Sequence, residues 1–395
     1  MDPNHASKVN ITYIPNDFVF SILSKLPVKS LRRFSCVRKS WTRLLENHNF
    51  INIFCKNLYS GSHSLDDDIC VILNQVVLDP FHCTFYLLSG DKFENKVKLD
   101  LPPPFHIQHN RVSVIRILGS ATNGIICIYN CDNHTIAVLW NPATQEVMVI
   151  PPSLAEFKRE FITKITLHGF GYDHVRDDYS VIQHVCYTKF KEHRLDNVIP
   201  HPFWEIYSLK NSCWRKIDID MPTRNWIYNS DLYLNGMCHW WGKNNNLVSF
   251  NLCKEEHFIT PSPFEDVHDT LDIHLIALNG HVAMISYSKK AISFQISILG
   301  EFGVKESWIR LFYFRCLSCI EQSIGAGEKG NIFFTRKDGQ LVCFDLTTGM
   351  VENVGLKGEI LWSQTVIYKK NLQLIGAIDN LNINLLVHLQ FNRQE

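Results

Sequence analysis

The chain of 395 residues contains no apolar run long enough to cross a membrane as a helix. Such a helix requires roughly 18–20 consecutive apolar residues. A secretory signal is also missing, because residues 1–13 are polar and have no continuous apolar core behind a basic start. We therefore expect a soluble protein of the cytoplasm, the nucleus or both, with no membrane partner.

Regular cysteine spacing and an excess of charge are missing too. The 13 cysteines are odd in number and irregularly spaced, which argues against a disulfide framework and favours reduced thiols. The formal net charge is zero and no aromatic-plus-basic stripe is present, so nothing indicates a nucleic-acid partner. With 12% aromatic residues, the composition is that of a well-packed globular protein.

Motifs that carry chemistry are missing as well. The sequence contains no Gly-x-Ser-x-Gly elbow, no His-Glu-x-x-His and no phosphate-binding glycine-rich loop that opens a helix. Cys316 and Cys319 have the spacing of metal ligands, but a structural zinc site needs a second pair. We therefore expect no catalytic residue, no metal and no cofactor.

What the chain does contain is a helical stretch from Ile14 to Phe50. Apolar residues recur at helical spacing between Asp17 and Leu26, and Pro15 and Pro27 flank this helix. Further helices are expected from about residue 28 to 37, from 39 to about 47, and from 50 to 58. A bundle of this size is marginal alone, because too little of its surface is buried.

The charge of this stretch differs from that of the rest. Residues 1–60 carry nine Lys and Arg against three Asp and Glu, a net charge of +6, and the remainder carries −6. Two interpretations follow. The helices form a basic surface that docks on a partner, or they form an amphipathic cap on the chain's own second domain.

Beyond a Gly- and Ser-containing linker at residues 59–68, the pattern changes to short apolar runs rich in β-branched and aromatic residues. A unit recurs in which a Gly precedes a strand, a polar turn and a second strand. Its members begin at Gly124, Gly236, Gly280 and Gly330. A period of about 40–50 residues is typical of four-stranded propeller blades. We predict a mainly β fold with a β-propeller of six blades, seven at the outside, over residues 69–395; the alternative is a pair of β-sandwiches.

The repeat also predicts details of this fold. Each Gly should begin the inner strand of its blade, and residues 141–144 should form a turn. Trp140, Phe250 and Phe344 should occupy equivalent buried positions between blades. The closing blade should combine residues 69–88 with strands at 365–376 and 385–391, because sealing a ring removes its exposed edges.

The helical stretch resembles the F-box of plant F-box proteins. The resemblance rests on Ile14-Pro15, Ile22-Leu23, residues 26–31 (LPVKSL) and residues 37–41 (VRKSW), followed by Leu44-Leu45 and Phe50. It implies an F-box domain over residues 1–58 that docks on a Skp-type adaptor of a cullin ubiquitin ligase. By the same resemblance, the interface would be formed by Ile14, Pro15, Ile22, Leu23, Leu26, Pro27, Leu31, Val37 and Trp41.

The β region resembles the F-box-associated domain of plant F-box proteins, a group that includes S-locus F-box and kelch-like proteins. The resemblance is carried by residues 120–129 (SATNGIICIY), 139–152 (LWNPATQEVMVIPP), 170–173 (FGYD), 205–217, 233–241 and 247–252. No Gly-Gly doublet heads a blade, unlike in kelch repeats proper. The resemblance implies a non-catalytic receptor that binds a protein target for ubiquitination. Two alternatives stay open: a propeller enzyme of the glycosidase or lyase class, and a scaffold without a role in ubiquitination.

Target recognition is expected in loops that depart from the repeat length, held by rigid blades. The longest departure spans residues 189–202, and a second candidate spans residues 223–226. An alternative reading of the first is a solvated hairpin loop without a partner. The residues we select for target binding are Lys191, His193, Arg194, Arg224 and Trp226.

Overall fold

The computed structural model describes most of the chain. The described residues are 16–26, 30, 37, 39–45, 47, 50, 53, 69–78, 81–105, 114–131, 136–155, 161–189, 200–223, 231–243, 246–264, 271–288, 293–315, 320–327, 330–346, 348–357, 360–371 and 375. The chain divides into two compact units, Met1–His63 and Ser64–Glu395.

The N-terminal unit contains helix α1 (Asn16–Leu23) and helix α3 (Lys39–Leu45). Both lie where the sequence predicts a helix, and each ends two or three residues early. After α1 the backbone tightens, because the N–H groups of Lys25 and Leu26 bond to carbonyls three residues back, at 3.1 and 3.2 Å. A tightened last turn is a common helix ending. Most of the expected helices at 28–37 and 50–58 lies outside the described residues.

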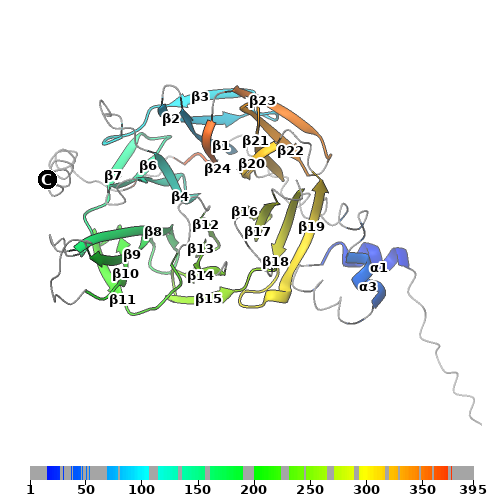
Figure 1. Cartoon of the computed structure of the whole chain (residues 1–395), viewed down its shortest axis with the longest axis horizontal. Coiled ribbons are helices and arrows are strands. Elements are labelled where there is room, and N and C mark those ends of the chain that lie inside the picture. The colour runs from blue at the N-terminus through cyan, green and yellow to red at the C-terminus, as the bar shows by residue number, and fades with distance from the viewer. Residues whose placement is uncertain are drawn as a thin grey trace, which may run out of the picture. The chain divides into compact units, whose positions relative to one another are not determined.

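The second unit is a ring of six four-stranded antiparallel sheets, shown in Figure 1. The strands of each blade are given from the innermost outwards. Blade I consists of β24 (Ile360–Lys369), β1 (Ile69–Leu78), β2 (Phe81–Ser89) and β3 (Asn95–Leu99). Blade II consists of β4 (Ile115–Thr122), β5 (Ile125–Asn130), β6 (Ala137–Asn141) and β7 (Glu146–Val149), and blade III of β8 (Phe161–Asp173), β9 (Asp178–Lys189), β10 (Phe203–Ser208) and β11 (Cys213–Ile217). Blade IV is β12 (Leu232–Leu234), β13 (Met237–Trp241), β14 (Leu247–Asn251) and β15 (Glu256–Thr260); blade V is β16 (Leu271–Leu278), β17 (His281–Ser288), β18 (Ser293–Leu299) and β19 (Trp308–Arg315); blade VI is β20 (Ile320–Ala326), β21 (Asn331–Arg336), β22 (Gln340–Asp345) and β23 (Val351–Lys357). The predicted six-bladed propeller is confirmed, and the sandwich alternative is not what the chain adopts.

Blade I closes the ring by joining the two ends of the propeller. β24 pairs with β1 from Ile69 to Val77, so the last strand becomes the innermost strand of the first blade. β24 therefore covers the inner edge of β1, which would otherwise be an unpaired strand edge. The prediction that the closing blade combines strands from both ends of the propeller is confirmed for β1, β2 and β24, which is the strand near residue 365. The blade is completed by β3, and residues 385–391 lie outside the described part.

The recurring Gly residues occupy a different place from the predicted one. Gly124, Gly236, Gly280 and Gly330 precede the second strand of their blades, not the innermost one. Three of them follow an Asn, and in these pairs both residues have positive φ, between 46° and 79°. Two-residue hairpins of type I′ require positive φ at both central positions, which Asn-Gly tolerates best. The prediction was wrong because the Gly marks the turn between the first two strands.

Trp140, Phe250 and Phe344 occupy equivalent positions in the strand pairing of their blades, as predicted. Each is the penultimate residue of the third strand of its blade, and it pairs with the residue two positions after the repeated Gly. Trp140 and Phe250 are fully buried, whereas Phe344 is half-buried. The hydrophobic clusters of the molecule lie between neighbouring blades, as between blades I and II around Trp140.

The two ends of the propeller differ. At the turn end, which holds the connections after the first and third strands of each blade, short hairpins dominate. Asn141, Asp173 and Asn251 each accept a backbone N–H bond two residues on, at 2.9–3.0 Å, which is how Asx turns form. The predicted turn at 141–144 is confirmed. The opposite end, here named the loop end, holds the longest connections, at residues 100–114, 150–160, 190–202, 218–231 and 261–270.

Among the described residues, no helix is both long enough and apolar enough to span a membrane.

Candidate functional site

An open groove of about 780 Å³ lies at the loop end between blades III and IV. Lys164 and Thr166 of β8 line one side, with His184 and Cys186 of β9. The other side is formed by residues 220–223, which follow β11, and by Lys243 and Ile259 of blade IV. The groove therefore combines two blades with the first residues of the connection between them.

The wall at residues 221–223 is fixed to blade IV. The indole Nε1 of Trp240 donates to the carbonyl of Pro222 at 3.0 Å, and the backbone N–H of Lys243 donates to the carbonyl of Thr223 at 2.9 Å. A Cβ at Gly242 would come within 2.8 Å of the Pro222 side chain, so only Gly allows this contact. Met221 is buried beneath them. The groove wall is thus held in place before any ligand binds.

His184, which lines the groove, packs against a cluster of buried aromatic rings. The rings of His184 and Trp204 lie 5.0 Å apart, and His168 lies 4.7 Å from Trp204 and 5.1 Å from Trp240. Burial lowers the pKa of His184 to about 4, helped by the charge of Lys243 and opposed by that of Asp220. The imidazole is therefore neutral at physiological pH.

The charges of the groove are Lys164 and Lys243 against Asp220. All three side chains are exposed, and so is Ile259. A surface with two cations, one anion, a neutral imidazole and an exposed isoleucine suits a partner that brings acidic and apolar side chains together. With a pKa of about 4, His184 is a weak base.

The predicted target-binding residues, Lys191, His193, Arg194, Arg224 and Trp226, lie outside the described residues. The described residues that flank them do come together. Pro202, at the exit of the first loop, and Thr223, at the start of the second, both line the groove. The sequence offered the two segments as separate candidates, and the fold brings their flanks to one site.

Sequence reasoning missed the residues that form the groove itself, namely Lys164, His184 and Lys243. They lie in or beside regular strands, where they look like ordinary strand residues. Only the pairing of β8 with β9 and the packing of blade III against blade IV bring them together.

The predicted adaptor-binding residues lie on both faces of the helices. In α1, Val19 and Leu23 are buried one turn apart. About 100° around the helix from them, Phe18 and Ile22 are 64% and 54% exposed. The apolar residues predicted for this helix therefore form two groups: Val19 and Leu23 are buried, and Phe18 and Ile22 face the solvent.

The remaining members of that set are partly described. Val37 is 67% exposed, whereas Leu26 and Trp41 are half-buried. Ile14, Pro15, Pro27 and Leu31 lie outside the described residues. The assignment of this set to an adaptor stays a prediction.

Metal ligands are not grouped anywhere in the described part of the chain, where no cluster of three or more His, Cys, Asp or Glu side chains is suited to an ion. None of the nine described cysteines forms a disulfide. Burial raises the pKa of Cys83 and of Cys343 to about 12, so both stay protonated. Cys316 and Cys319 lie outside the described residues.

The sequence profile of the F-box associated beta propeller domain matches residues 76–374 of the chain, which is nearly the whole propeller. The chain belongs to this family. Blade II, with its Asn-Gly turn and the Asn141 turn, carries two of the stretches on which the resemblance rested.

Relatives of this F-box-associated chain occur in Arabidopsis thaliana. F-box protein CPR1 is 23% identical over 372 residues, which cover 87% of this chain and 84% of the relative. Another F-box protein is 27% identical over 290 residues, covering 71% and 85%, and an F-box/kelch-repeat protein is 22% identical over 318 residues, covering 75% and 78%.

Among solved structures, the chain is similar to an oligogalacturonate lyase in complex with manganese, with 11% identity, a TM-score of 0.39 and coverage of 71% of this chain and 77% of the other. It is also similar to YCF48 bound to D1 peptide, with 11% identity, a TM-score of 0.39 and coverage of 76% and 91%. Likeness at this level carries no functional inference.

Proposed function

We propose that this protein is the substrate receptor of an SCF-type cullin ubiquitin ligase. The helical unit docks on a Skp-type adaptor, which links it to the cullin, and the propeller binds a protein target. The receptor performs no chemistry; it raises the local concentration of the target beside a separate conjugating enzyme. It acts in the cytoplasm or the nucleus. The domain boundaries we propose remain 1–58, 59–68 and 69–395.

The observation that carries this proposal is the solvent-facing apolar pair Phe18 and Ile22 on α1. Full burial of such a side chain contributes about 1.5–3 kcal/mol, so leaving two exposed one turn apart forgoes a sizeable stabilisation. Val37, which the resemblance assigns to the same interface, is exposed as well. Relatives named as F-box proteins support the same reading, and the net charge of +6 over residues 1–60 suits an acidic partner.

The test compares the two faces of α1 in the full chain. We expect the double variant F18D/I22D to lose adaptor binding by at least tenfold in a titration with a purified Skp-type adaptor, because hot-spot contacts typically cost 2 kcal/mol or more. Leu26 and Pro27 replaced by Ala should have the same effect. Circular dichroism should show an unchanged propeller in each case.

The control is V175D, which places one such negative charge at an exposed apolar residue of the propeller. It should bind the adaptor like the unchanged chain. Adaptor binding that survives F18D/I22D would refute the docking surface, and no binding by the unchanged chain would remove the receptor hypothesis in favour of a scaffold.

The glycosidase form of the enzyme alternative requires two carboxylates facing a common substrate. Asp231 is the one carboxylate among the described residues that line the central cavity of the propeller. The described part of that cavity therefore offers no pair for a glycosidase mechanism, and we favour the receptor.

A further inference from the structure

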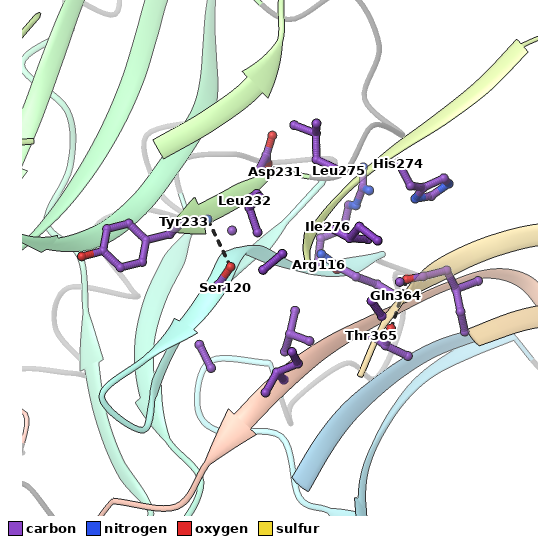
Figure 2. A pocket seen from close by; sticks show the side chains of 18 of the residues that line it. Arg116, Ser120, Asp231, Leu232, Tyr233, His274, Leu275, Ile276, Gln364 and Thr365 are labelled. Atoms are coloured by element: carbon purple, nitrogen blue, oxygen red, sulfur yellow. Dashed lines mark hydrogen bonds between the residues drawn. The ribbon is translucent and has the colours of Figure 1, made fainter. Parts of the chain in front are cut away.

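A cavity of about 240 Å³ lies at the centre of the propeller. Its lining comes from the innermost strands of five blades, β4, β12, β16, β20 and β24. Figure 2 shows Arg116, His274, Gln364 and Thr365 around this space, with a hydrogen bond of 3.1 Å from the backbone of Tyr233 to Ser120 joining β12 to β4. The cavity is separate from the groove at the loop end.

Arg116 is the unusual residue in this lining. Its side chain is 3% exposed, and neither Nε nor Nη1 has a hydrogen-bond partner. No described carboxylate forms an ion pair with it. The guanidinium carbon lies 4.2 Å from the ring centre of Trp362, a cation–π contact.

A buried guanidinium stays charged, and burying a charge without a partner is strongly unfavourable. One cation–π contact offsets only part of this penalty. By comparison, the half-exposed Arg176 contacts Asp173 at 2.6 Å and Glu255 at 3.0 Å. The lack of such a carboxylate at Arg116 points to an anion supplied from outside the chain.

Two further donors line the same cavity. Trp362 Nε1 and Ser363 Oγ are buried and have no hydrogen-bond partner in the protein. Trp362 and Ser363 lie on β24 of blade I, whereas Arg116 lies on β4 of blade II. The titratable groups of the described lining are Arg116, Lys369, His274, Asp231 and Tyr233, and burial raises the pKa of Tyr233 to about 12, so its phenol is neutral. With two cations against one carboxylate, the cavity favours a negatively charged ligand.

The strands that carry these donors are held in fixed positions. The side chain of Gln364 accepts from the backbone N–H of Ile117 at 3.0 Å and donates to its carbonyl at 2.8 Å, which joins β24 to β4. Thr365 donates to the carbonyl of Ile324 at 3.3 Å, which joins β24 to β20. Donors on a rigid support form a preorganised site, which lowers the entropic cost of binding.

We propose that the central cavity binds a small organic anion, whose carboxylate or phosphate oxygens accept hydrogen bonds from Arg116 and the neighbouring donors of β24. A ligand that contacts Arg116 on blade II and Trp362 on blade I joins the closing blade to the next one, so it stabilises the closed ring. At 240 Å³ the cavity is smaller than the 300–1,000 Å³ typical of sites for drug-sized ligands. This inference does not depend on the proposed receptor function.

The test uses the full chain, with inorganic phosphate and succinate as probes and sodium chloride at matched ionic strength as the reference. Thermal unfolding should shift upward by roughly 3–5 °C at a probe concentration about a hundredfold above its Kd. Isothermal titration should give a single site per chain. A shift with phosphate alone assigns a phosphorylated ligand, a shift with succinate alone assigns a carboxylate, and either supports the proposal.

Arg116→Met removes the charge and keeps much of the side-chain volume. We expect it to abolish the probe-dependent shift and to leave the probe-free unfolding temperature unchanged or higher, because the unpaired buried charge is gone. The control is Arg310→Met, an exposed arginine stacked on Tyr313 at 5.9 Å, which should respond to the probes like the unchanged chain.

Trp362→Phe gives a second measurement, because it keeps an aromatic face under Arg116 and removes the indole donor. It should weaken probe binding severalfold without abolishing it. The absence of any shift in the unchanged chain overturns the proposal. An equal shift in the unchanged chain and in Arg116→Met means an adventitious ion only and overturns it as well.

Discussion

At the scale of single residues, the β8–β9 turn shows how side-chain charges hold two blades together. Asp173 accepts backbone N–H bonds from Val175 and Arg176 at 2.9 and 3.0 Å. Arg176 in turn contacts Asp173 and, on blade IV, Glu255. Burial favours a higher pKa for Asp173, but hydrogen bonds from the Cys253 thiol and from Arg176 and Val175 outweigh it and lower the pKa to about 2.

We predict that Asp173→Asn lowers the free energy of unfolding by about 2 kcal/mol at pH 7, since hydrogen bonds to a charged group are lost. The ordinary pKa of 3.8 lies above the folded value of about 2. Ionised Asp173 therefore stabilises the folded chain above about pH 4, and this stabilisation is lost as the pH falls toward 2. Urea unfolding at several pH values should show the difference between the two proteins constant from pH 7 to 5 and shrinking below 4. Asp218→Asn, at an exposed site, should match the unchanged chain, and a difference that persists at pH 2 would contradict the assignment.

At the scale of turns and strands, two Asn-Gly hairpins allow the effect of backbone conformation on stability to be measured apart from the effect of side-chain packing. Gly124 and Gly280 have nearly the same φ, +79° and +73°. A Cβ at Gly124 would lie 2.5 Å from the Cβ of Asn371, whereas a Cβ at Gly280 would have no atom within 4 Å.

Gly280→Ala should therefore cost about 1 kcal/mol from the backbone conformation alone. Gly124→Ala should cost about 2–4 kcal/mol, because the new methyl group also overlaps a neighbour. Denaturant unfolding of the two variants side by side measures the difference. Equal losses would mean that the contact with Asn371 adjusts freely.

The groove at the loop end is likewise a property of elements, and its charge can be tested with synthetic peptides. We predict that Lys164→Glu with Lys243→Glu weakens binding of a ten-residue peptide of mixed Asp, Glu and Leu by at least tenfold, measured by fluorescence anisotropy. The pKa of His184 should also rise above about 4, because the charge of Lys243 no longer opposes protonation. Shortening the loop at residues 189–202, or replacing Arg224 and Trp226 with Ala, should reduce capture of a native target without changing adaptor binding.

Lys254→Glu is the control for this experiment, because it changes the same charge on an exposed residue at the turn end. It should leave peptide binding unchanged. Equal binding by the groove variant and by this control would place target recognition elsewhere on the propeller.

At the scale of the whole molecule, stability depends on the closure of the ring. β24 supplies the innermost strand of blade I and bonds to β4 through Gln364. Beyond β24, Asn141 donates to the carbonyl of Asn371 at 2.8 Å, and the N–H of Ile375 donates to Glu146 at 2.7 Å. Asn371 and Ile375 are therefore held on blade II.

We predict that a chain ending at residue 375 unfolds in one cooperative transition near the temperature of the unchanged chain. A chain ending at residue 359 loses β24, exposes the edge of β1 and should aggregate or unfold at least 10 °C lower. Differential scanning calorimetry with light scattering measures both properties. A cooperative, soluble chain ending at residue 359 would show that closure is dispensable.

The sequence by itself determined the local features of this protein. Its 40–50-residue period predicted six blades, its short apolar runs rich in β-branched and aromatic residues predicted strands, and the bracketing prolines placed α1. These signals are local, because turn residues and side-chain periodicity act within a few positions of each other. The same local signals placed the repeated Gly before the wrong strand. The sequence of a two-residue turn is the same whichever two strands of a blade it connects.

The tertiary structure alone decided which distant residues share a site. Lys164, His184 and Lys243 meet only because blades III and IV pack together. Arg116 faces Trp362, 246 positions away, only because β24 closes the ring beside β4. The tertiary structure likewise distinguishes the apolar residues of α1, because it buries Val19 and Leu23 and leaves Phe18 and Ile22 exposed. Sites of this kind depend on contacts between residues far apart in the chain, and periodicity in a single sequence carries no information about such pairs.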